Sequence, residues 1–164
     1  MNIQLRDVSS IVVIGGGPSG SLFTHFALRL AKEHGRRIQI TILDCRNFIQ
    51  KGPGGCNMCA GVLSETLIRK MESQKIDIPK SRVQQEINGY YFQTQERGIQ
   101  LHHPRPGHKP KIITVFRGNG PRFSEITTNI SFDDFLQKHV ASHGVKIISA
   151  VVEEIEIPKD PQEL

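Results

Sequence analysis

Residues 11–20 read IVVIGGGPSG, a short apolar run that passes directly into a glycine-rich turn. The apolar part, residues 11–14, is rich in β-branched side chains, which is typical of a strand buried on both faces of a parallel sheet. After the turn, apolar residues recur at steps of three and four and predict an amphipathic helix. These residues are Leu22, Phe23, Phe26, Ala27, Leu30 and Ala31. Pro18 suits the first turn of this helix, and His34-Gly35 suits its end.

A second apolar strand is predicted over residues 38–43 and ends at Asp44. Strand, glycine turn, helix and strand together predict a right-handed βαβ unit. Gly15, Gly17 and Gly20 have the spacing of a dinucleotide-binding turn: a tight turn, close approach of backbone to a pyrophosphate, and close packing of helix on strand. Asp44 follows Gly20 by 24 residues and is placed to accept hydroxyl groups of an adenosine ribose. The alternative is a structural glycine turn with Asp44 at a solvated strand end.

The rest of the chain is predicted to be a β-rich insertion followed by a return to the first sheet. Strands are expected over 83–94, 99–102, 112–116, 145–150 and 151–157, and helices from Ser64 to about Ser73 and from Ser131 through Val140. We therefore predict an α/β fold, a Rossmann-like FAD/NAD(P)-binding βαβ unit with an inserted β-rich segment. We treat residues 1–164 as a single, apparently truncated domain with a polar tail at 158–164.

Composition narrows the function classes. The chain has 164 residues, a net charge of +5 and 37% hydrophobic residues, enough apolar surface for a core. No apolar run approaches the roughly 18 residues of a membrane span, and the first ten residues do not resemble a secretory signal. The basic residues are dispersed, and eight Phe, two Tyr and no Trp leave little for base stacking, so we expect no nucleic acid partner. Three cysteines fit a reducing compartment, and we expect a cytoplasmic protein.

The pair Cys56 and Cys59 lies in a glycine-rich loop and has three interpretations. The first interpretation is a dithiol redox pair, although such a motif normally opens a helix after a strand. The second is half of a zinc site, completed by His102 and His103 or by a partner chain. In the third, one of the two cysteines lines a cofactor pocket. The sequence holds no hydrolase motif.

Several stretches resemble the flavin-dependent geranylgeranyl reductase family, which is related to the aromatic-hydroxylase flavoproteins. The matching stretches are IVVIGGGPSGS at 11–21, ILDCR at 42–46, CAGVLS at 59–64, FDDFL at 132–136 and HGV at 143–145. The first is shared by many flavoproteins that bind two dinucleotides. The cysteine stretch and the Phe-Asp helix, in this order and spacing, narrow the resemblance to this family.

This resemblance implies FAD as the cofactor and hydride delivery from reduced flavin to isoprenoid double bonds. It implies that the pyrophosphate is held by the turn formed by Gly15, Gly17, Pro18, Ser19 and Gly20. Asp44, where the family more often has Glu, would hold the adenosine ribose, and Arg46 would lie beside the adenosine half. The loop from Gly54 to Gly61 would pass near the flavin, which makes Cys59 the candidate catalytic residue.

The sequence departs from the family pattern in two ways. The family places Arg three residues before the Phe of its Phe-Asp pair, whereas this chain has Asn129, which removes a cation near the cofactor. The family also continues with a second glycine-aspartate motif and a substrate-binding portion. We therefore expect an N-terminal fragment with little activity alone, complemented by another polypeptide. The alternatives are a non-catalytic nucleotide-binding module that pairs with another polypeptide, and a small metal-binding interaction protein that uses Cys56 and Cys59.

Overall fold

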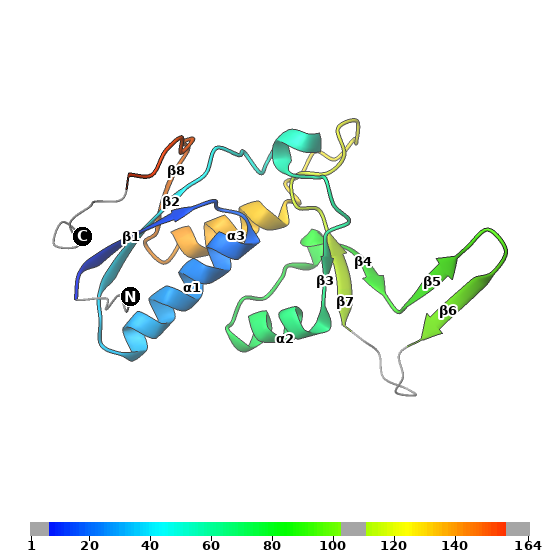
Figure 1. Ribbon diagram of the computed structural model, residues 1–164, viewed down its shortest axis with the longest axis horizontal. Coiled ribbons are helices and arrows are strands. Elements are labelled where there is room, and N and C mark those ends of the chain that lie inside the picture. The colour runs from blue at the N-terminus through cyan, green and yellow to red at the C-terminus, as the bar shows by residue number, and fades with distance from the viewer. Residues whose placement is uncertain (1–6, 103–110, 157–164) are drawn as a thin grey trace. The chain divides into compact units, whose positions relative to one another are not determined.

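The computed structural model describes residues 7–102 and 111–156. They form a mixed α/β structure, as the sequence predicts (Figure 1). The chain divides into two compact units: unit 1 comprises Met1–Arg46 and Leu136–Leu164, and unit 2 comprises Asn47–Phe135. The predicted polar tail lies outside the described residues.

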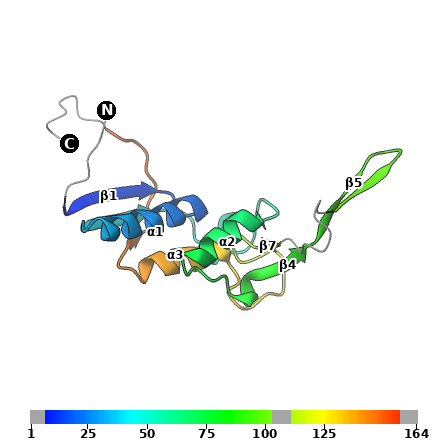
Figure 2. The ribbon, with the colours of Figure 1, turned by 90° about the horizontal axis from the view of Figure 1, so that it is seen from below.

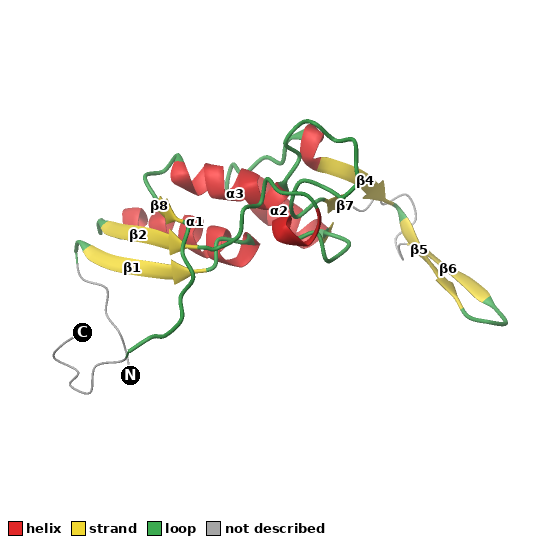
Figure 3. Ribbon diagram, turned by 90° about the horizontal axis from the view of Figure 1, so that it is seen from above, coloured by secondary structure: helices red, strands yellow, loops and turns green. Residues whose placement is uncertain are grey.

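Unit 1 contains a three-stranded parallel sheet with the order β1-β2-β8. Strand β1 (Ser9–Ile14) pairs with β2 (Ile38–Leu43), and β2 pairs with β8 (Lys146–Ile148). Helix α1 (Pro18–Glu33) connects β1 to β2 (Figure 3). The predicted parallel strand–helix–strand unit is therefore confirmed, with Pro18 in the first turn of the helix. Gly35 ends the helix in a left-handed conformation, at φ +62°.

The core of unit 1 lies on one face of this sheet. Ile40 and Ile42 of β2 are buried together with Val140 and Val145. Ile11, Val13, Ala27 and Leu28 are among the residues packed against this cluster, so α1 and the last turns of α3 (Phe132–Ala141) cover the same face (Figure 2). On the other face, Val12 is 60% exposed and Ile14 is 53% exposed. The expectation of a strand buried on both faces is wrong, because no described element covers the second face.

The apolar stripe predicted on α1 is only partly covered: Ala27 packs against the core, while Phe23 is 53% exposed. The fully buried residues of the helix are instead the small polar Ser21 and Thr24. Apart from Leu22, the stripe residues line an open groove of about 580 Å³, to which Ile11 of β1 and Ile38 of β2 also contribute. Its lining residues are Ile11, Phe23, Phe26, Ala27, Leu30, Ala31, His34, Arg36 and Ile38.

Unit 2 holds the β-rich insertion. Strands β3 (Val62–Leu63), β7 (Ile112–Val115) and β4 (Val83–Ile87) form an antiparallel sheet in that order, and β5 (Gly89–Gln93) and β6 (Gly98–His102) form a separate hairpin. The single strand region expected over 83–94 is thus two strands. Two short 3-10 turns, η1 (Gly52–Gly55) and η2 (Lys80–Arg82), precede β3 and β4.

Helix α2 (Glu65–Ser73) begins as predicted at Ser64, whose side chain accepts a hydrogen bond from the backbone N–H of Leu67 at 3.3 Å. Its buried residues, Ile68 and Met71, join a core that includes Ile113 and Val115 of β7. Helix α3 begins in unit 2 and ends in unit 1. Ser131 caps it by accepting from the N–H of Asp134 at 3.1 Å, as expected.

The predicted strand over 151–157 is wrong for its described part, since residues 151–156 form no strand. Val151 is 69% exposed and Ile155 is 66% exposed. Alternation of apolar residues favours a strand only where a neighbouring strand accepts its backbone hydrogen bonds. The preceding strand, β8, spans only Lys146–Ile148 of the expected 145–150.

Candidate functional site

The glycine turn after β1 has the conformation that its spacing predicts. Gly15 lies at φ +97°, a region that L side chains rarely adopt, and its N–H donates to the carbonyl oxygen of Leu43 at 2.8 Å. A Cβ at Gly20 would overlap the carbonyl oxygen of Gly15, so the start of α1 can approach β1 this closely only with glycine there. Both residues therefore hold the turn against the carboxyl end of the sheet.

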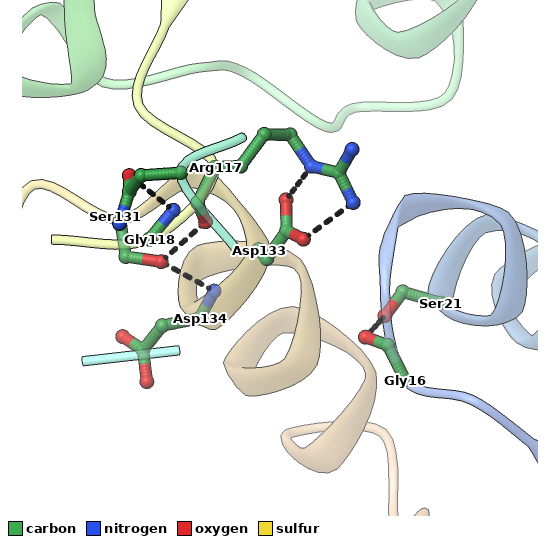
Figure 4. A network of polar contacts seen from close by, with 8 residues as sticks. Gly16, Ser21, Arg117, Gly118, Ser131, Asp133 and Asp134 are labelled. Carbon is green, nitrogen blue, oxygen red and sulfur yellow. Dashed lines mark hydrogen bonds and ion pairs between the residues drawn. The ribbon is translucent and has the colours of Figure 1, made fainter. Parts of the chain in front are cut away.

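Gly16 is a residue of this turn that the glycine spacing does not single out. It is buried, and a Cβ there would overlap Nε2 of Gln137 on α3. The buried hydroxyl of Ser21 donates to the carbonyl oxygen of Gly16 at 3.0 Å (Figure 4). The Ser21 hydrogen bond holds the carbonyl group of Gly16, and Gln137 leaves no room for a side chain there, although neither has a signal in the sequence pattern.

The N-terminus of α1 has no side-chain cap. Gly17 is the N-cap residue, no side chain caps the helix, and its first turn contains no acidic residue. Pro18 has no N–H, and the amides of Ser19 and Gly20 belong to the first turn, where a helix offers no internal partner. The partial positive charge of the helix end is therefore directed at this turn.

Asp44 lies beside the glycine turn, at the end of β2. Its Oδ2 accepts from the N–H of Gly16 at 2.5 Å, and its Oδ1 accepts from the N–H of Arg46 at 2.7 Å. Its own N–H donates to the carbonyl oxygen of Ile148 at 3.1 Å. Each carboxylate oxygen keeps a second lone pair for a further donor such as a sugar hydroxyl. The structure thus brings Asp44 and the backbone of Arg46 to the turn, while the Arg46 side chain is at an exposed position.

The candidate catalytic residue Cys59 belongs to unit 2 and is exposed; Cys56 is partly buried, and neither forms a disulfide. Cys59 lines a small pocket of about 420 Å³ together with Gln84, Thr114 and Phe116, among others. Cys56 has a left-handed backbone at φ +65°, immediately after η1.

Asn57, between these cysteines, joins two loops of unit 2. Its Nδ2 donates to the carbonyl oxygen of Gly52 at 2.9 Å, and its Oδ1 accepts from the N–H of Gly118 at 3.0 Å. The same two loops are also joined by a hydrogen bond from the N–H of Gly52 to the carbonyl oxygen of Gly120 at 2.8 Å. The sequence identifies this segment as a loop, but not the contact between the two loops.

Arg117 forms a largely buried ion pair in unit 2. Its Nε and Nη2 donate to the two oxygens of Asp133 at 2.6 and 2.8 Å, and the Asp133 carboxylate is fully buried (Figure 4). The hydrogen bonds to Asp133 raise the pKa of Arg117 well above its ordinary value, and the thiols of Cys56 and Cys59 raise it further, against the effect of burial. Arg117 therefore links the start of α3 to the loop after β7 within this unit.

A cationic side chain, that of Arg82, lies next to Asn129. The guanidinium group of Arg82 donates to the backbone carbonyl oxygen of Asn129 and, at 3.1 Å, to its Oδ1. Nδ2 of Asn129 donates to Oδ2 of Asp134 at 2.7 Å. A positive charge therefore lies at the position where the family resemblance leads us to expect an arginine, although it comes from a distant part of the sequence.

Among the described residues, no group of three or more His, Cys, Asp or Glu side chains is arranged to hold a metal ion. Within the same residues, no helix is long and apolar enough to cross a membrane. No protein-family model matches the chain, and no curated protein matches it either.

Proposed function

We propose that this chain binds FAD at the glycine turn of unit 1, in a Rossmann-like arrangement, as part of a flavin-dependent oxidoreductase. The observation that carries the proposal is the hydrogen bond from Gly16 N–H to Asp44 Oδ2 at 2.5 Å. It joins an acidic group that can receive a ribose to a turn that can receive a diphosphate, at the carboxyl ends of two adjacent parallel strands.

The residues of the turn have separate roles in this proposal. The uncapped first turn of α1, with the amides of Ser19 and Gly20, faces the diphosphate, and Gly17 leaves room for it. Asp44 accepts the hydroxyl groups of the adenosine ribose. When bound, the flavin supplies hydride transfer to an isoprenoid double bond, the reaction that the family resemblance implies. The free cysteines are consistent with a cytoplasmic location, which we include in the proposal.

A second candidate is a nucleotide-binding module that pairs with a complementing polypeptide. It is favoured by the apolar side chains of Val12 and Ile14, exposed on one face of β1. β1 is also the end strand of its sheet, so one row of its backbone groups has no neighbouring strand among the described residues. The two candidate functions share the FAD site. They differ in whether this chain catalyses the reaction by itself or only together with another polypeptide.

The test of the site uses Ser19→Glu, with Ser19→Gln as its matched control. Ser19 is exposed and in the first turn of α1, where a negative charge favours the helix but repels a diphosphate. A like charge about 4 Å away costs between about 1 kcal/mol in bulk water and about 4 kcal/mol near a protein surface, and about 1.4 kcal/mol corresponds to tenfold in affinity. We expect calorimetric titration with FAD to show saturable binding to the wild-type chain and to Ser19→Gln. In Ser19→Glu, we expect the affinity for FAD to be lower by about tenfold or more.

Thermal unfolding of both variants separates loss of the ligand site from loss of the fold. Equal FAD affinity in the two variants, at unchanged stability, contradicts the assignment of the diphosphate to this helix end. Where binding is present, substrate-dependent bleaching of the flavin spectrum by the isolated chain distinguishes an active enzyme from a module that requires another polypeptide.

A further inference from the structure

Three histidines gather in unit 1, between α1 and the end of α3. Nδ1 of His25 and Nε2 of His139 lie 3.1 Å apart, a hydrogen-bond distance. The ring of His143 is 4.8 Å from that of His139 and 6.2 Å from that of His25, measured between ring centroids. These three rings, the histidine cluster, link an early helix to a late one across more than a hundred residues of sequence.

The hydrogen bond between His25 and His139 depends on one unprotonated nitrogen. A ring nitrogen accepts only when it carries no proton, and a fully charged imidazole donates from both nitrogens. If both rings are charged, Nδ1 of His25 and Nε2 of His139 are two donors facing each other. Nε2 of His25 is moreover buried and has no hydrogen-bond partner within residues 7–102 and 111–156, so charging this ring also leaves a second buried donor.

The charges around the cluster oppose protonation. Burial lowers the pKa of His25, and the nearby His143 and Arg29 lower it further. Burial likewise lowers the pKa of His139, with added contributions from His143 and His25. On α1, Arg29 is paired with Glu33 at 3.4 Å, one turn beyond it. On α3, the neighbouring charged side chain is that of Lys138, which is at an exposed position and positive.

We propose that the contact between α1 and α3 in unit 1 is pH-sensitive and that it opens when the histidine cluster becomes charged. The ordinary pKa of both His25 and His139 is 6.5, and it is lowered in the folded chain. The open state therefore binds protons more readily than the closed one. The contact has its full stability above pH 6.5 and loses it progressively as the pH falls through the lowered values.

The contact between α1 and α3 also affects the glycine turn. Gln137 precedes His139 by two residues on α3, and its Nε2 packs directly against Gly16. Movement of this part of α3 therefore removes a side chain that supports the turn. Resting on the proposed function, the same acidification weakens FAD binding.

The test is amide hydrogen exchange of the full chain at pH 7.5 and 5.5, compared as protection factors so that intrinsic exchange is corrected. We expect protection in residues 136–141 to fall by up to about tenfold for each unit by which a histidine pKa is lowered. In His139→Gln, which keeps a hydrogen-bonding side chain that cannot become charged, most of this fall disappears. His34→Gln, an exposed histidine of α1 outside the cluster, serves as the control and retains it.

Equal protection of wild-type residues 136–141 at the two pH values overturns the proposal, as does an undiminished fall in His139→Gln. Should that variant not fold, an NMR titration of the wild-type His25 and His139 decides: a pKa of either residue at or above its ordinary value of 6.5 also overturns the proposal. FAD affinity is measured at both pH values, because the diphosphate bridge of FAD does not change charge between them. Absence of FAD binding at both pH values contradicts the proposed function but leaves the exchange result valid, whereas equal affinity at both values contradicts the effect of the cluster on the glycine turn.

Discussion

Asp133 is fully buried and Arg117 binds it through two parallel hydrogen bonds of 2.6 and 2.8 Å. The Arg117 side chain is 24% exposed, so this ion pair is largely removed from water. Removal of one partner from a buried pair leaves the other charge uncompensated. The pair therefore holds the start of α3 against the preceding loop of unit 2, and its loss has a cost that a surface pair lacks.

We expect Asp133→Asn to lower the free energy of unfolding by about 3 kcal/mol, as measured by urea denaturation, because it leaves the guanidinium group of Arg117 unpaired. The matched control is Glu72→Gln, which breaks the exposed pair with Lys111 in the same unit. Exposed pairs contribute less than about 1 kcal/mol. Similar losses in the two variants contradict the inference that burial makes the Arg117 pair strong.

Lys75 gives a prediction of opposite sign. It follows the C-cap residue Gln74 of α2 in a left-handed conformation, φ +59°, where glycine is favoured. Because an L side chain costs about 1 kcal/mol in this conformation, we expect Lys75→Gly to raise the unfolding free energy by a few tenths to about 1 kcal/mol. Lys70→Gly, inside the same helix, is expected to lower it by about 1 kcal/mol. Thermal unfolding that shows the same sign for both variants refutes this account.

The parts of the fold that the sequence predicts are those set by local chemistry. The glycine turn, Asp44 at the end of β2 and the cap at Ser64 depend on backbone conformations and short spacings, and the structure confirms them. The exposed face carrying Val12 depends instead on what packs against the sheet, which no short pattern encodes. The alternation of apolar and polar residues over 151–157 is similarly insufficient to form a strand, because a strand requires a neighbouring strand to pair with.

The contacts that the sequence does not reveal join residues far apart in the chain. Arg117 pairs with Asp133, Arg82 reaches Asn129, and Gln137 packs on Gly16. Each is an ordinary side chain in an unremarkable context, and its role arises only when two segments meet. The contact of Arg82 with Asn129 is likewise not predicted by any spacing, because the two residues are 47 positions apart in the sequence.

Asp7 gives a prediction on pH dependence. Hydrogen bonds from the Arg37 side chain, and then from its backbone N–H, lower the pKa of Asp7 from 3.8 to about 2. The lowered value means that the folded chain favours the charged carboxylate. This contribution to stability is present above pH 3.8 and is lost as the pH falls toward 2.

We expect an NMR titration of the Asp7 carboxyl group in the wild-type chain to give a pKa of about 2. In Arg37→Gln the pKa is expected to rise most of the way to 3.8, because the side-chain hydrogen bonds are the largest cause of the shift and the backbone N–H remains. Arg36→Gln, at the adjacent exposed position, is the control and is expected to leave the pKa of Asp7 at about 2. A pKa of Asp7 that does not respond to Arg37→Gln shows that the pair does not form in solution.

Gly20→Ala tests the close approach of α1 to the glycine turn. In an ordinary helix this substitution stabilises by up to about 1 kcal/mol. Here a Cβ would overlap the carbonyl oxygen of Gly15, which is backbone and cannot move aside as a flexible side chain can. We therefore expect a loss of about 2 kcal/mol or more in the free energy of unfolding, together with weaker FAD binding. Ser19→Ala, at the preceding exposed position, is expected to change stability by no more than about 0.5 kcal/mol. If Gly20→Ala instead stabilises the chain, the helix does not pack against Gly15 as described, and the glycine spacing loses its structural explanation.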